Sequence, residues 1–62
     1  MENIINKLSK DLDFAAKMKL EYEDKIIFEP ENRSLNIAML DFYNGMEEAL
    51  KDAINIVKEE AK

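Results

Sequence analysis

LNIAMLDFYNGMEEALKDAINI, residues 35–56, is the stretch of this sequence that decides the fold. Its apolar residues recur at alternating steps of four and three, which places them along one face of an α-helix that packs against other helices. These apolar positions are Leu35, Met39, Phe42, Met46, Ala49, Ala53 and Ile56. The stretch therefore predicts a long amphipathic helix from about residue 35 to near the C-terminus.

A similar apolar line precedes Pro30, the only proline of the chain. It comprises Ile5, Leu8, Leu12, Ala15, Tyr22 and Ile26, and Lys19 interrupts it. A lysine on such a face either lays its methylenes along the core with its ammonium at the rim, or fixes the register of the helices. The line predicts a first helix over about residues 2–27. Because proline disfavours helical geometry in the residue before it, this helix should end by Phe28.

The turn between the two helices is expected in residues 29–34, where Asn32 and Ser34 are candidate N-caps for the second helix. The resulting fold is an all-α two-helix hairpin, with residues 1–62 as a single domain. A hairpin of this length cannot enclose a core by itself, and without cysteine or histidine it has neither disulfides nor a Cys/His zinc site. We therefore expect it to form a homodimer, an antiparallel four-helix bundle. The residues expected in the core or the dimer seam are Ile5, Leu8, Leu12, Tyr22, Leu35, Met39, Phe42, Met46, Ala53 and Ile56.

Two features leave alternatives open. Residues 20–37 contain short alternating and β-prone stretches around the turn, so an α+β fold with a short β-hairpin between two helices is the alternative. The only glycine, Gly45, either breaks the second helix or marks the close approach of a neighbouring helix. The apolar line keeps its phase across Gly45, which favours one continuous helix.

The residue types present argue against catalysis. Histidine and cysteine, the commonest general base and a common nucleophile, are absent, and a single glycine cannot form a phosphate-binding loop. The carboxylates are expected to lie on solvated faces, so we expect no enzyme, no cofactor and no metal. No apolar run is long enough for a membrane span, and no signal-like segment is visible, so we expect a cytoplasmic protein without membrane contact.

The charge balance is acidic, with 14 acidic and 9 basic residues and a formal net charge of −5. No basic patch is visible, so direct binding of nucleic acid is not expected. An acidic surface commonly serves solubility. The alternative is an acidic inhibitor that mimics nucleic-acid charge on a nucleic-acid-handling enzyme, of the kind that phages and mobile elements carry. Its acidic face would include Glu47, Glu48 and Asp52.

Some large apolar residues fall outside the expected seams. Phe14 and Met18 are four residues apart and share a flank of the first helix, and Leu20 lies away from its apolar line. They either belong to a wide bundle core or form a surface that binds another protein. The sequence thus predicts a small non-enzymatic regulatory or adaptor protein that binds itself and an unidentified protein. A structural subunit of a larger helical assembly is the further alternative.

Overall fold

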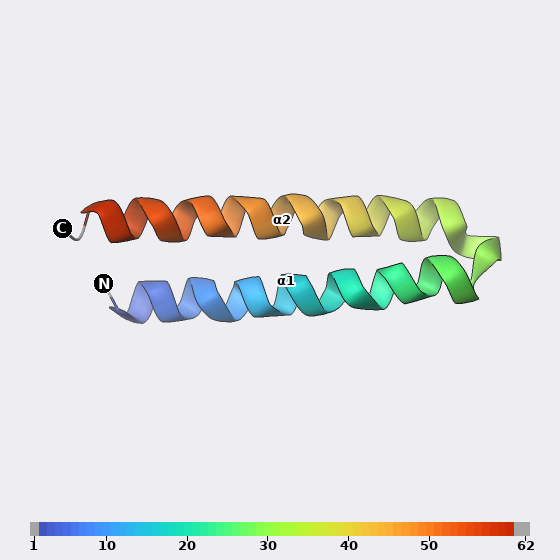
Figure 1. Cartoon of the computed structure of the whole chain (residues 1–62), viewed down its shortest axis with the longest axis horizontal. Coiled ribbons are helices and arrows are strands. Elements are labelled where there is room, and N and C mark those ends of the chain that lie inside the picture. The colour runs from blue at the N-terminus through green and yellow to red at the C-terminus, as the bar shows by residue number, and fades with distance from the viewer. Residues whose placement is uncertain (1, 61–62) are drawn as a thin grey trace.

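A computed structural model describes residues 2–60, with side chains from residue 3 onward. Helix α1 (Glu2–Phe28), a short 3-10 helix (Pro30–Asn32) and helix α2 (Arg33–Glu60) follow one another along the chain. The two long helices lie side by side and antiparallel, and they form a rod of 49 × 14 × 10 Å (Figure 1). The predicted all-α hairpin is confirmed. Because residues 2–60 contain no strand, the alternative of a β-hairpin over residues 20–37 is wrong.

The turn lies where proline predicts it. Helix α1 ends at Phe28, and the Glu29 N–H still donates to the Lys25 carbonyl oxygen over 2.8 Å. The Asn32 N–H donates to the Glu29 carbonyl at 3.0 Å, and the Asn32 amide donates to the Glu29 carboxylate at 3.4 Å. Helix α2 begins one residue later, at Arg33, so Asn32 precedes the helix and Ser34 lies inside it.

Helix α1 meets α2 along the predicted apolar line. Its residues are buried or half-buried at every position, including Lys19, and Ala15 is fully enclosed with 0% exposure. The line comprises Ile5, Leu8, Leu12, Ala15, Lys19, Tyr22 and Ile26. The first of the two expected faces is therefore the one that forms the helix–helix contact.

Helix α2 meets α1 along a different line from the expected one, displaced by one residue. This interface line comprises Asn36, Leu40, Tyr43, Glu47, Leu50, Ile54 and Val57. It has the same four-three spacing, and all its members are buried or half-buried. The physical reason is the positive charge of Lys19 on α1. The row that starts at Asn36 places the Glu47 carboxylate 3.3 Å from the Lys19 ammonium, whereas the row that starts at Leu35 contains only apolar side chains. Leu35, Phe42 and Ile56 are consequently exposed and do not belong to the core of the hairpin.

Gly45 does not interrupt α2, which runs without a break from Arg33 to Glu60. No glycine in the described part of the chain has a positive φ angle. The favoured interpretation of one continuous helix is thus confirmed.

The hairpin encloses very little. Ala15 and Ile54 are the only apolar side chains of the described residues that are buried. The accessible surface is 4751 Å², whereas a compact folded monomer of this mass exposes roughly 4,100 Å². The excess is surface that a globular fold of the same length would have removed from water.

Asn36 provides a test of the interface. It is only 3% exposed, and its Nδ2 has no hydrogen-bond partner. Because a buried unsatisfied amide destabilises a fold, Asn36→Leu should raise the free energy of unfolding by about 1–2 kcal/mol. Urea denaturation followed by circular dichroism measures this value. The exposed Asn44 on the same helix provides the control, and Asn44→Leu should change stability by less than about 0.5 kcal/mol. A less stable Asn36→Leu variant would show that the amide has a partner in solution.

Candidate interaction surface

The apolar line that the sequence singled out on α2 faces water. Leu35, Phe42 and Ile56 are 62%, 60% and 57% exposed, and Ala49 is exposed as well. Between this outer row and the interface line lie three half-buried residues, Met39, Met46 and Ala53. Helix α2 therefore has two adjacent rows that are mostly apolar. One contacts α1, and the other is exposed at four positions and half-buried at three.

Aromatic rings connect this uncovered row to α1. The Tyr43 ring stacks on Tyr22 with centroids 5.8 Å apart, and it meets the Phe14 ring edge-on at 6.1 Å. Phe42 also meets Tyr43 edge-on, at 5.0 Å. Phe14 and Phe42 thus flank the same ring from the two helices, and Met18 follows Phe14 one helical turn later.

We call this continuous surface the open face. It comprises Phe14, Met18, Leu35, Met39, Phe42, Met46, Ala49, Ala53 and Ile56. In an antiparallel pair, the residues directly before the interface positions of one helix lie on the same side of the pair as those directly before the interface positions of the other helix. Phe14 and Met18 on α1 and the outer row on α2 are such residues, so they lie on one side of the rod. The open face joins Phe14 and Met18 to the residues that were expected in a dimer seam.

Leu20 does not belong to the open face. It lies two residues after Met18, a rotation of about 200° around the helix, and it is 64% exposed on the opposite flank. The expected surface of Phe14, Met18 and Leu20 is therefore divided between two sides.

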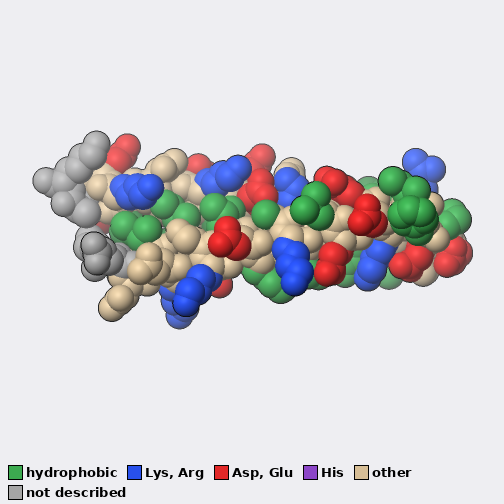
Figure 2. Space-filling model, turned by 60° about the horizontal axis from the view of Figure 1, so that its bottom comes forward, with side chains coloured by type: hydrophobic (Ala, Val, Ile, Leu, Met, Phe, Trp, Pro, Cys, Tyr) green, Lys and Arg blue, Asp and Glu red, His purple; other side chains and the backbone are tan. Residues whose placement is uncertain are grey.

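Figure 2 shows one face of the molecule. Acidic and basic side chains are spread along the rod there, and hydrophobic side chains form smaller groups, one of them at the turn.

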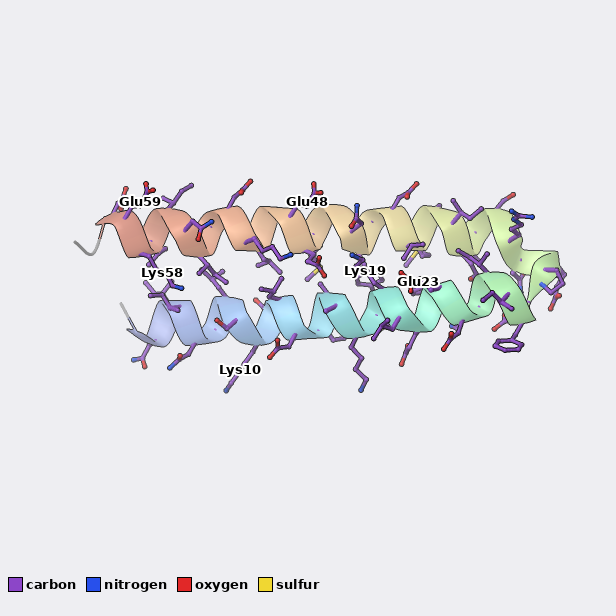
Figure 3. The ribbon with its side chains drawn as sticks, viewed as in Figure 1. Lys10, Lys19, Glu23, Glu48, Lys58 and Glu59 are labelled. Carbon is purple, nitrogen blue, oxygen red and sulfur yellow. The ribbon has the colours of Figure 1, made fainter. Side chains whose placement is uncertain are left out.

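The expected acidic cluster is divided as well. Glu47 is only 16% exposed, and its Oε1 accepts hydrogen bonds from Lys19 at 3.3 Å and from Lys51 at 3.4 Å. In Figure 3 Lys19 points toward α2, whereas Glu48 points away from α1 into solvent. Glu48 and Asp52 are exposed. Of the three acids, only these two remain accessible to a binding partner.

The electrostatics of Glu47 follow from this placement. Desolvation raises the pKa of its carboxyl, but the hydrogen bonds and positive charges of Lys19 and Lys51 outweigh that effect and hold the pKa below its usual value. The folded state thus favours the carboxylate form.

Among residues 2–60, no group of three or more His, Cys, Asp or Glu side chains is placed to hold a metal ion, and no pocket is present. Neither helix contains a stretch that is apolar enough to cross a membrane.

Comparison of the chain with protein-family models, with curated proteins and with solved structures finds no match. The open face gathers exposed apolar side chains from both helices, and we argue a function from it.

Sequence reasoning missed the second row of α2 as the contact with α1. Leu40, Tyr43, Leu50, Ile54 and Val57 follow Asn36 with the four-three spacing, so the signal was present. The polar residues Asn36 and Glu47 made this row hard to identify as the contact with α1, because polar residues are uncommon at helix–helix contacts.

The Lys19–Glu47 pair generates a pH-dependent prediction. A carboxyl whose pKa is lowered by folding stabilises the fold above its unfolded pKa of roughly 4.3, and this contribution is lost as the pH falls through the folded pKa. Glu47→Gln should therefore be less stable than wild type near neutral pH, and the difference should shrink toward about pH 3. Urea denaturation at both pH values measures it.

The control for this experiment is Glu48→Gln, which removes one carboxylate from an exposed position on the same turn. Its stability difference from wild type should vary less with pH. An equal difference for Glu47→Gln at both pH values would mean that the ion pair contributes nothing to stability.

Proposed function

We propose that this protein is a small, non-enzymatic regulatory or adaptor protein of the cytoplasm that acts by binding protein through its open face. The observation that carries the proposal is the row of exposed apolar side chains on α2. From Leu35 to Ile56 this row extends over about 30 Å of helix. Contiguous apolar surface of several hundred Å² is typical of an interaction site in a water-exposed protein.

The side chains of the open face suit a helical partner. Phenylalanine and methionine are common anchors in protein interfaces, and methionine adapts its shape to the surface it meets. The four-three spacing on α2 matches the way in which an amphipathic helix packs into the groove beside another helix. The partner is accordingly expected to offer a helix with an apolar row of its own.

The alternative of an acidic inhibitor has less support. A charge mimic needs a regular array of accessible carboxylates, and the Glu47 carboxylate is bound to two lysines at the helix–helix contact. A subunit of a larger helical assembly would use the same open face, and it differs from the proposal in the size of the complex.

Photocrosslinking in cells of the natural host tests the proposal. We would replace Phe42 with the photoreactive analogue p-benzoylphenylalanine, which keeps an aromatic ring at the same position. Irradiation should yield covalent adducts with protein, because an interface residue lies against its partner. Mass spectrometry of the adducts identifies that partner, and an adduct of twice the chain mass identifies a second copy.

The matched control places the same analogue at Glu48, on the charged side of α2 (Figure 3). Adducts from position 42 that are at least about tenfold more abundant than those from position 48 would support the proposal. Equal yields from both positions, or none from position 42, would contradict it.

A further inference from the structure

We infer that the open face binds a second copy of this chain, antiparallel, with a two-fold axis that crosses α2 beside Gly45 and Met46. The inference rests on the proposed function and names the partner of the same surface. The order of side chains along the row favours a second copy over an unrelated protein. The position of the only glycine and the uncovered area fit a closely packed helix on this face.

The order of side chains on α2 is self-complementary. A two-fold interface requires that one surface match itself after reversal. Reversing α2 about Gly45 and Met46 sets Leu35 opposite Ile56 of the second copy. The same reversal sets Phe42 opposite Ala49, and it brings Met39 and Met46 to within one residue of Ala53 and Met46 of the second copy.

Two of these contacts also combine a large residue with a small one. A large ring at Phe42 meets a small methyl group at Ala49, and the long Met39 side chain meets Ala53. Alternation of large and small residues across a contact allows two helices to interdigitate at the density of a protein interior. Any four-three repeat has nearly the same spacing after reversal, so it is the matching of Phe42 with Ala49 and of Met39 with Ala53 that favours a second copy.

Gly45 lies where the two copies of α2 would approach. It follows Phe42 by three residues and precedes Ala49 by four, so it borders the open face near the axis. A glycine in the interior of a helix costs about 1 kcal/mol relative to alanine. Within the hairpin nothing requires this cost, because a Cβ at Gly45 would meet no atom within 4 Å. Close approach of the second copy supplies the reason.

The uncovered area is of the size that a dimer needs. Phe14 and Phe42 are 50% and 60% exposed, and because an aromatic side chain can bury roughly 200 Å², each leaves about 100 Å² in water. Leu35 and Ile56 add comparable amounts, and the methionines and alanines add less. The sum, about 600 Å², lies at the lower end of the roughly 600–1,000 Å² that each partner buries in a standard interface. None of the nine residues is charged, and the charged residues on the same side of α1, which include Asp11 and Glu21, would border the contact.

The first experiment measures mass by light scattering over a hundredfold range of concentration. Wild type should be a dimer. Phe42→Glu should raise the dimer dissociation constant at least about 100-fold, because it places a charge in the apolar contact. Leu20→Glu is the matched control, since Leu20 is 64% exposed on the opposite flank; it should leave the dimer intact. Circular dichroism verifies that both variants remain helical.

The second experiment determines the orientation with single cysteines, since the chain has none of its own. A short bis-maleimide should link two copies of Met46→Cys across the axis. Leu35→Cys and Ile56→Cys should each fail to link with themselves, because an antiparallel pair separates identical positions by about 30 Å. An equimolar mixture of these two variants should form the Leu35–Ile56 cross-link.

The outcomes separate the possibilities. Self-linking of both Leu35→Cys and Ile56→Cys would mean a parallel dimer and would overturn the inference. A monomer at every concentration would overturn it as well. In that case adducts with another protein from position 42 would leave the proposed function standing, whereas their absence would remove both. If Met46→Cys loses helicity, the mixture of the other two variants decides the orientation alone.

Discussion

The ion pair between Lys19 and Glu47 determines which side of α2 faces α1. Such a pair contributes little to stability in itself, because both side chains retain contact with water. Its effect is on specificity: a lysine at a helix–helix contact is costly without an acceptor, and only the row that starts at Asn36 provides one opposite it. A slip of one residue along α2 would set the Lys19 ammonium against apolar side chains. The charge pair therefore selects one arrangement from two that the apolar residues alone allow.

Selection of one row leaves the other uncovered. Helix α2 has apolar side chains over two adjacent rows, and a single neighbouring helix can cover only one of them. The row from Leu35 to Ile56 consequently faces solvent, together with Phe14 on α1, which shares the Tyr43 ring with Phe42. Outside the open face, charged side chains of both signs share the surface with exposed apolar residues, which include Leu20, Ile27 and Phe28. Figure 2 shows both kinds on one face of the molecule. A local electrostatic choice between α1 and α2 thus produces a rod with an apolar side, and the capacity to bind protein follows from it.

The local features of the fold could be read from the sequence, whereas the pairing could not. Pro30 ends the first helix for reasons confined to its own ring and its neighbour, and the phase of the α2 row across Gly45 shows that the helix continues. The choice of row depends on Lys19, which lies 28 residues away from Glu47. Proximity in sequence likewise did not show that Glu47 faces α1 while Glu48 faces solvent, because adjacent residues on a helix point about 100° apart.

Several features of the chain weaken the hairpin as an isolated unit. Asn36 buries an unpartnered amide, Gly45 reduces helix propensity, and the enclosed apolar core consists of Ala15 and Ile54. None of these is needed to form two antiparallel helices, and each has a better substitute if the hairpin alone is considered. Natural chains retain such residues where a binding surface or a specific pairing depends on them. Because the hairpin fully buries so few apolar side chains among its described residues, the folding of this chain is expected to be coupled to its association.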